Sequence, residues 1–208
     1  MNLAFIKPAM DAVLARVQRA TESARSRRRL GDLRLKLRSL GQNVEICSDL
    51  LVDYPERVDI GDWVYVGPEG RFYGRGGLAI SDHTIIGPRV TIMTSMHNYK
   101  EASYVPYDEV ELLGRVEVGV ATWIGFGAIL LPGVVLGQGC IVGAGSVVTR
   151  SFPDGSIIGG NPAQLIRTRD MTHFLRCLSE GKTYLKQKAL LGLTKVERRL
   201  KPRPTREP

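Results

Sequence analysis

One aliphatic side chain recurs every six residues through the middle of the chain. The recurring positions are Val118, Ile124, Leu130, Leu136, Val142 and Val148. The fifth position of each step is mostly small or of modest size, with Thr122, Ala128, Val134, Cys140, Ser146 and Phe152. Helices repeat at 3.6 residues and strands at 2, so neither explains this period. The pattern predicts a mainly β fold, a parallel β-helix in which eighteen residues make one three-sided coil.

The same period appears upstream, as Ile80, Ile86 and Ile92, and more weakly as Ile60 and Val66. From Ile92 to Val118 the chain is two residues longer than four steps, so a segment at about 98–115 must leave the coil. This segment holds Tyr99, Tyr104, Tyr107, Asp108, Glu109 and Glu111. A projecting loop on a solenoid is usually a functional or an assembly element.

The two ends of the chain have a helical rather than a six-residue spacing. Residues 1–43 are predicted to form basic amphipathic helices. The repeat domain spans 44–167; its repeat ends near Pro153, and residues 159–163 lead out of the coil. In the C-terminal segment, 168–208, we expect a helix around Phe174, a break at Gly181, a second basic amphipathic helix over 185–200 and a disordered tail.

The net charge of +8 is unevenly distributed along the sequence. Residues 1–40 and residues 168–208 each carry about +7, so the body between them is acidic. A nucleic-acid-binding domain more often carries its positive charge on the folded surface that meets the strand, and we expect no nucleic-acid partner. The basic ends either pack on the body or on a neighbouring subunit, or contact anionic lipid.

The cysteine content and the lack of long apolar stretches bear on where in the cell the protein is found. The three cysteines, Cys47, Cys140 and Cys177, are widely spaced and form no CxxC motif, which favours neither a disulfide framework nor a zinc cluster. The first fifteen residues lack the apolar core of a signal peptide, and no stretch approaches the length of a membrane span. We expect a cytoplasmic protein, with the inner membrane face as a peripheral location.

Residues 116–167 carry a specific resemblance. They contain a Trp-Ile-Gly step, a Leu-Pro-Gly-Val step, the run Gly-Ala-Gly-Ser-Val-Val-Thr, and a closing Gly-Asn-Pro-Ala followed by Ile-Arg. The segment Ser-Met-His-Asn-Tyr at 95–99 precedes the projecting loop. In these features the chain resembles the hexapeptide-repeat acyltransferases, and within them the xenobiotic, maltose and galactoside O-acetyltransferase branch, which includes enzymes of polysaccharide biosynthesis. The resemblance covers about 44–167.

The resemblance implies a left-handed β-helix, a homotrimer and acetyl-CoA bound in the clefts between adjacent subunits, with a sugar hydroxyl as the usual acceptor. It also places His97 where the family has its catalytic histidine. An imidazole titrates near neutrality, so it can take the proton of an acceptor hydroxyl and return it to the leaving thiolate. We expect no metal, because only His83 and His97 lie in the repeat body and a three-imidazole zinc site needs one more.

Other site residues are carried over from the family position by position. Trp123 matches the tryptophan beside the thioester, and the backbone N–H of Phe126, next to Gly125, matches the donor to the acetyl carbonyl. Cofactor-binding positions are Gly125, Ala128, Ala144, Gly145, Arg150 and Arg167, the arginines suiting CoA phosphates. Each of these residues also has a purely structural interpretation. Trp123 could pack at an interface, the small residues could be ordinary coil positions, and the arginines could be solvated at the corners of the coil.

The group that orients His97 stays open among Asn98, Asp82, Asp108, Glu109 and Glu111, and we assign Asn98 and Asp82 to acceptor binding. The sequence thus predicts an acetyl-CoA-dependent O-acetyltransferase acting on a saccharide, in polysaccharide or lipopolysaccharide modification. Two alternatives remain: an N-acetyltransferase acting on a sugar or drug, and a non-catalytic β-helix scaffold.

Overall fold

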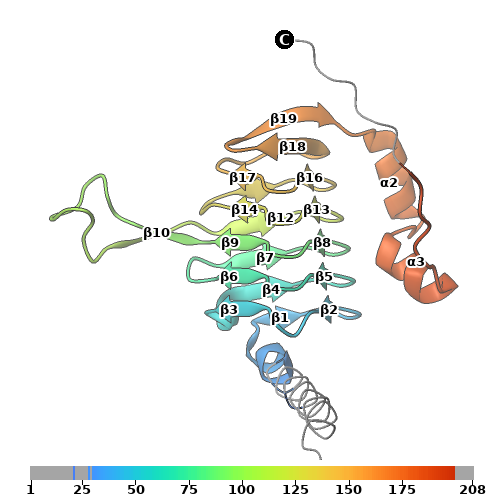
Figure 1. The fold of residues 1–208 in the computed structure, drawn as a ribbon, viewed down its shortest axis with the longest axis horizontal. Coiled ribbons are helices and arrows are strands. Elements are labelled where there is room, and N and C mark those ends of the chain that lie inside the picture. Colours follow the sequence, from blue (N-terminus) through green and yellow to red (C-terminus); the bar gives the residue numbers. More distant parts are fainter. Residues whose placement is uncertain (1–20, 22–27, 29, 200–208) are drawn as a thin grey trace, which may run out of the picture.

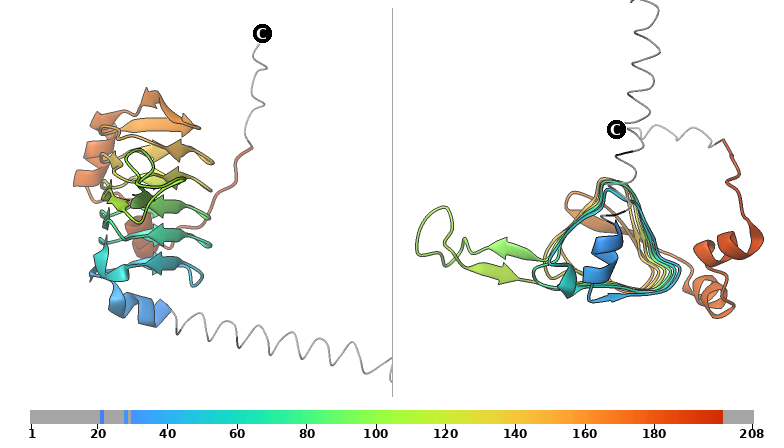
Figure 2. Two further views of the ribbon diagram at one scale, coloured as in Figure 1. Left: turned by 90° about the vertical axis from the view of Figure 1, so that its left-hand side faces the viewer. Right: turned by 90° about the horizontal axis from the view of Figure 1, so that it is seen from below.

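The computed structural model describes residues 21, 28 and 30–199. Most of the predicted N-terminal helical segment lies outside these residues. The described chain winds into a three-sided β-helix, drawn from the side in Figure 1 and along its axis in Figure 2. A hairpin projects from one corner of the triangle, and two C-terminal helices stand outside another part of it (Figure 2).

Each side of the triangle is one parallel sheet. Sheet A contains β1 (Ser39–Leu40), β4 (Val58–Ile60), β7 (Leu78–Ile80), β12 (Val116–Val118) and β15 (Val135–Leu136). Sheet B contains β2 (Glu45–Ile46), β5 (Tyr65–Val66), β8 (Ile85–Ile86), β13 (Trp123–Ile124), β16 (Ile141–Val142), β18 (Ser156–Gly160) and the antiparallel β19 (Ala163–Thr168). Sheet C contains β3 (Leu51–Asp53), β6 (Arg71–Tyr73), β9 (Thr91–Met93), β14 (Ile129–Leu130) and β17 (Val147–Val148).

The six-residue period fixes the core, as the sequence predicts. All six aliphatic positions from Val118 to Val148 are at most 1% exposed, and the fifth positions are buried beside them. Strand pairing is in register from coil to coil, for example Ile86 with Ile124 and Ile124 with Val142. The inner column of side chains therefore fills the prism, while the alternate residues of each strand face outward.

The coil extends further at both ends than the repeat alone indicates. At its start, β1 pairs with β4, so coil pairing already begins at Ser39. At its end, beyond the expected close of the six-residue repeat near Pro153, β18 still pairs in parallel with β16. The chain leaves the coil only after β18, when β19 turns back antiparallel to it.

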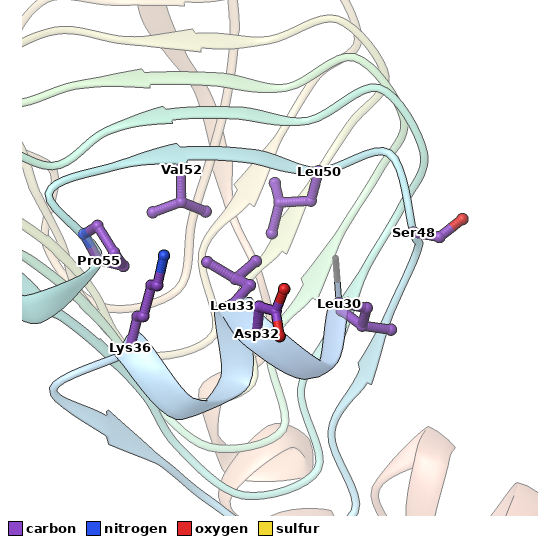
Figure 3. Close-up of a pocket in the computed structure, with 8 residues that line it drawn as sticks. All are labelled: Leu30, Asp32, Leu33, Lys36, Ser48, Leu50, Val52 and Pro55. Carbon is purple, nitrogen blue, oxygen red and sulfur yellow. The ribbon is translucent and has the colours of Figure 1, made fainter. Parts of the chain in front are cut away.

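The N-terminal end of the prism is closed by a helical segment at residues 30–36. Leu33 of this segment points toward Leu50 and Val52 of the first coil, and Leu37 just after it is buried (Figure 3). A cavity of about 290 Å³ remains between the helix and the coil. None of the predicted site residues lines it, so this end of the molecule acts as a cap on the core.

The C-terminal segment forms α2 (Met171–Ser179) and α3 (Tyr184–Leu191), both beside sheet B (Figure 1). The prediction of a helix over 185–200 is wrong in its length. Gly192 adopts a left-handed conformation, with φ of 60°, and caps α3 after Leu191. Residues 192–199 are exposed and have no regular structure.

Candidate active site

His97 lies at the base of the projecting hairpin, formed by β10 (Ser95–His97) and β11 (Glu111–Leu113). Its direct cross-strand partner is Glu111, and the two side chains meet with His97 Nδ1 3.4 Å from Glu111 Oε1. The imidazole also stacks on the ring of Tyr107, with centroids 4.0 Å apart and planes 9° from parallel. With Nδ1 facing the carboxylate, Nε2 is the ring nitrogen left to exchange a proton with a substrate.

Glu111 is itself held from the neighbouring coil. Arg75 Nη1 lies 3.9 Å from Glu111 Oε1, and Arg75 Nη2 donates a hydrogen bond of 2.6 Å to the hydroxyl of Tyr54. The Arg75 guanidinium also lies over the Tyr54 ring, 5.1 Å from its centroid. Cation, carboxylate and imidazole thus form one connected row on this corner of the coil.

A small cavity of about 150 Å³ opens next to this row. Its walls come from three coils, and every lining residue carries a polar group: Asp53, Tyr54, Tyr73, Arg75, Ser95 and Glu111. Carboxylates, hydroxyls and a guanidinium are the groups that hydrogen-bond sugar hydroxyls. The cavity is therefore chemically suited to a polar acceptor next to Glu111.

Asn98 and Asp108 hold the hairpin closed. Asn98 is buried, and its amide nitrogen donates to both oxygens of Asp108, at 3.2 and 3.0 Å. Burial alone would raise the pKa of Asp108, but the N–H groups of Ser103 and Val110 and the Asn98 amide outweigh it, and the pKa is lowered. The amide nitrogen of Asn98 is therefore used within the loop, and the assignment of Asn98 to acceptor binding stays a prediction.

Asp82 lies on a different corner of the prism, between sheets A and B. Its Oδ1 accepts a hydrogen bond of 2.8 Å from the backbone N–H of Asp62 in the preceding coil. In the same way, Asp62 Oδ1 accepts from the backbone N–H of Gln42, and Asp154 Oδ1 accepts from the backbone N–H of Gln138. Asp82 thus belongs to a series of aspartates that satisfy turn N–H groups, and the structure does not bring it to His97 within one chain.

Trp123 and Phe126 also lie away from His97. Trp123 stands on the outer face of sheet B and is 55% exposed, while Phe126 lies at the corner between sheets B and C. His97 follows the opposite end of sheet C, so the width of that sheet separates the imidazole from Phe126. Within the described residues the N–H of Phe126 has no hydrogen-bond acceptor. Among the described residues this leaves an unpaired backbone donor at the position that the sequence singles out.

The small residues near Phe126 divide into two groups. Ala144 and Gly145 are exposed at the same corner, one coil further on, where the N–H of Gly145 donates to the carbonyl of Phe126. Gly125 and Ala128 face inward: a Cβ on Gly125 would lie 2.7 Å from the backbone nitrogen of Ala144, and Ala128 is fully buried. Coil packing alone accounts for these two, whereas Ala144 and Gly145 leave the corner open.

The two predicted phosphate-binding arginines are exposed near the C-terminal end of the coil. Arg150 Nη2 donates to the side chain of Gln164 at 2.7 Å and lies over the ring of Phe152. Arg167 lies on β19, opposite Ile157. Neither has an acidic partner within the described residues.

Sequence reasoning missed two contributors to the row around His97. Arg75 and Tyr54 lie in earlier coils, and no motif marks them. Glu111 was one of several open choices, and only the register of the hairpin distinguishes it from Glu109. In the part of the chain that the structure describes, no group of three or more metal-ligating side chains converges, and no helix is long and apolar enough to cross a membrane.

The known proteins that this chain resembles agree with the β-helix fold described above. Residues 115–150 match the family model for the bacterial transferase hexapeptide (six repeats). The putative colanic acid biosynthesis acetyltransferase WcaF of Escherichia coli K12 is 30% identical over 137 residues, covering 66% of this chain and 72% of WcaF.

Two solved structures extend the comparison. A maltose O-acetyltransferase from Clostridium difficile 630 superposes with a TM-score of 0.62 at 27% identity, over 66% of this chain and 73% of that chain. A hexapeptide-repeat acetyltransferase from Vibrio cholerae, complexed with acetyl-CoA, gives 0.62 at 23% identity, over 69% and 78%. Repeat, fold and relatives agree, and the chain belongs to the hexapeptide-repeat family of acyltransferases.

Proposed function

We propose that the protein is an acetyl-CoA-dependent O-acetyltransferase that acetylates a hydroxyl of a saccharide, in polysaccharide or lipopolysaccharide modification. The observation that carries the proposal is that Glu111 and Tyr107 hold the imidazole of His97 beside a polar cavity. Three relatives support the substrates: one is named for colanic acid biosynthesis, one for maltose, and one was solved with acetyl-CoA.

In this proposal His97 is the general base. Nε2 takes the proton of the acceptor hydroxyl as its oxygen attacks the thioester carbonyl. The resulting tetrahedral oxyanion accepts a hydrogen bond from the N–H of Phe126. When the intermediate collapses, the carbon–sulfur bond breaks and the CoA thiolate takes the proton back from the imidazole. Glu111 and Tyr107 fix the ring orientation and favour the protonated imidazole that forms in between.

The active site is shared between subunits of a homotrimer. One chain holds His97 and the Phe126 N–H at opposite ends of sheet C, so a second copy must supply one of them. The hairpin is suited to reach that copy, because it exposes a series of large apolar side chains: Tyr99, Tyr104, Val105, Val110, Leu112 and Leu113. Exposed apolar side chains gathered on one projecting element are typical of an interaction surface.

CoA lies along the corner that begins at Phe126. Ala144 and Gly145 keep this corner free of side chains, so the pantetheine arm can approach the backbone. Arg150 and Arg167 meet the phosphates, for which guanidinium groups are suited. Trp123 contacts the acyl end, since its indole stands exposed on the adjoining face of sheet B.

The C-terminal segment provides peripheral contact with an anionic membrane, at the inner membrane face of a cytoplasmic enzyme. Leu190, Leu191, Leu193 and Val196 are exposed there, beside Lys195, Arg198 and Arg199. Apolar side chains interspersed with cations favour the surface of anionic bilayers. Sedimentation with phosphatidylglycerol vesicles tests this contact. A protein that binds acetyl-CoA but does not sediment with the vesicles would contradict it.

An acceptor screen tests the activity itself. Release of free CoA thiol from acetyl-CoA is followed with a panel of mono- and oligosaccharides, and with amino sugars as competitors for N-transfer. We expect acceptor-dependent release that His97→Gln reduces by about 10²–10⁴-fold. Release that His97→Gln leaves unchanged would contradict the role of His97, and transfer confined to amino groups would contradict O-acetylation.

A further inference from the structure

The outer face of sheet B carries an unusual column of large apolar side chains. Tyr65, Ile85, Trp123 and Ile141 occupy equivalent outward positions on β5, β8, β13 and β16, paired in register from strand to strand. Neighbouring strands lie about 4.8 Å apart, so the column is about 14 Å long. An outward-facing sheet position is ordinarily polar when water covers it. This column therefore indicates a surface that another group shields from water.

Helices α2 and α3 stand beside sheet B (Figure 1), and they cover the column only in part, since Trp123 is 55% exposed. They are anchored at their edges: Phe174 packs against Gly139, Thr183 shares a hydrogen bond of 3.1 Å with Nδ1 of His83, and Lys188 pairs with Glu45 at 3.3 Å. Between these anchors the helices do not fill the space above the sheet. A groove remains, with the column as its floor and the helices as its outer wall.

Two adjoining cavities make up this groove. The first, about 340 Å³, runs from Ile141 past Trp123 to Ile85 and is walled by Phe174, Leu178 and Tyr184 among others. The second, about 320 Å³, continues from Ile85 to Tyr65 and ends at Leu193 and Lys195. Ile85 and Tyr184 belong to both. Volumes of this size are typical of small-molecule sites.

The charge of the lining has one sign. No acidic residue lines either cavity. Arg169 and Lys182 line the first cavity, and Lys188 and Lys195 line the second. Glu180 and Glu45 pair with Lys182 and Lys188 from outside the groove. Arg169 and Lys195 have no acidic partner among the residues that the structure describes.

We propose that this groove binds a lipid phosphate with a single hydrocarbon chain, the carrier of the saccharide acceptor. The chain lies over Ile85 toward Tyr65 and Leu193, and the anionic head lies near Arg169. The far end of the groove opens at the exposed segment that follows α3, where a chain can enter. The other end, at Ile141 and Arg169, lies next to Trp123. Two parts of this inference rest on the proposed function: that the lipid carries the saccharide acceptor, and that Trp123 links the groove to the acyl donor.

Calorimetric titration of the full-length protein with monomeric dodecyl phosphate tests the inference. We expect saturable binding that Ile85→Glu and Leu193→Asp each weaken by about ten-fold or more, equivalent to about 1.4 kcal/mol. Matched controls are Val135→Glu, on the outward face of sheet A, and Leu175→Asp, which is exposed on α2 outside the lining of both cavities. The controls should leave affinity within about two-fold. Because Leu193 follows α3 and is exposed, its variant avoids the folding risk at Ile85.

Two further titrations specify the ligand. Dodecyl maltoside has the same chain with an uncharged head, and we expect it to bind at least about ten-fold more weakly. Saturating CoA should leave dodecyl phosphate binding unchanged, because CoA lies along the corner that begins at Phe126 and only the acyl end of the donor, which free CoA lacks, meets the groove at Trp123. Competition by CoA would overturn the proposal in favour of the acyl chain of a long-chain donor, and equal binding of the maltoside would overturn the anionic head.

The outcome separates this inference from the proposed function. Absence of saturable dodecyl phosphate binding in a protein that binds acetyl-CoA overturns the lipid groove and leaves the acetyltransferase standing. Groove-dependent binding in a protein that does not bind acetyl-CoA supports the lipid site and overturns the acetyltransferase. Equal loss in the groove variants and their controls overturns the location of the site.

Discussion

His97 and Glu111 face each other across the two strands of the projecting hairpin, with Nδ1 3.4 Å from Oε1. The pair is positioned by strand register, so it does not depend on the conformation of the loop tip. A carboxylate on Nδ1 keeps the other ring nitrogen available and stabilises the imidazolium that forms during transfer. Glu111 is therefore a positioning residue for the proposed base.

Removing this carboxylate should slow transfer without weakening donor binding. We expect Glu111→Gln to lower kcat by about 10–100-fold, because the amide keeps the size but loses the charge. The acetyl-CoA affinity should stay unchanged. Glu109→Gln is the matched control, since Glu109 precedes β11 and does not contact the imidazole. Steady-state kinetics with both variants check this, and equal effects would exclude a specific role for Glu111.

Sharing of the site between subunits predicts complementation. His97→Ala and Trp123→Ala should each be nearly inactive as homotrimers. When the two are co-expressed with different tags and purified as mixed trimers, about a third of the sites combine an intact His97 with an intact Trp123 from another subunit, because each mixed trimer has one such pair among its three interfaces. Activity should recover to about that fraction of wild type. Mixed trimers as inactive as the parents would show that both residues act from the same chain.

The sequence predicts the prism well because its signal is local and repeated. Each coil buries the same inner positions, so Val118 to Val148 carry the prediction six times over. The site is harder to predict because its contacts join coils: Arg75 reaches Glu111 across 36 residues, and Tyr54 reaches Arg75. Asn98 shows the same limit, since its proximity to His97 in sequence does not reveal that Asp108 holds its amide.

The helical ends show how far spacing alone can mislead. Apolar and basic residues continue at helical spacing beyond Leu191, yet Gly192 takes a positive φ and ends α3 there. The prediction of a longer helix follows the helical spacing of the apolar residues and does not treat Gly192 as a helix terminus. A glycine followed by further periodic residues is compatible with either a continued helix or a terminus, and tertiary packing decides between them.

Coil packing predicts different tolerances for two exchanges of glycine for alanine. A Cβ on Gly125 would lie 2.7 Å from both Ala144 N and Val142 O, backbone atoms that cannot move without disturbing the next coil. Gly133 meets nothing within 4 Å but has a φ of 83°. We expect Gly125→Ala to lower the free energy of unfolding by about 3 kcal/mol and Gly133→Ala by about 1 kcal/mol. Chemical denaturation measures both, and a smaller effect at Gly125 would contradict the packing argument.

The docking of the C-terminal helices should weaken in mild acid. Burial is the main cause that lowers the pKa of His83, and Lys186 acts in the same direction, against Asp82 and Asp62. The folded protein therefore resists a proton that the unfolded chain accepts below about pH 6.5. The contribution of His83 to stability is present above that pH and is lost as the pH falls through the lower folded pKa.

Hydrogen exchange, corrected for intrinsic rates, measures this effect. Between about pH 7.5 and about pH 5.5, protection of α2 and α3 should fall in the wild type, because His83 Nδ1 contacts Thr183 at the start of α3. His83→Gln should show a smaller change over the same range. An equal loss of protection in the variant would assign the acid sensitivity to another group.

The most direct test of the central claim is a calorimetric titration of acetyl-CoA into the purified protein, because it requires no knowledge of the acceptor. The account predicts saturable binding at about one site per subunit, retained in His97→Gln and weakened by Arg150→Gln. Absence of binding in a protein whose circular dichroism shows it to be folded would contradict the assignment of an acetyl-CoA-dependent transferase.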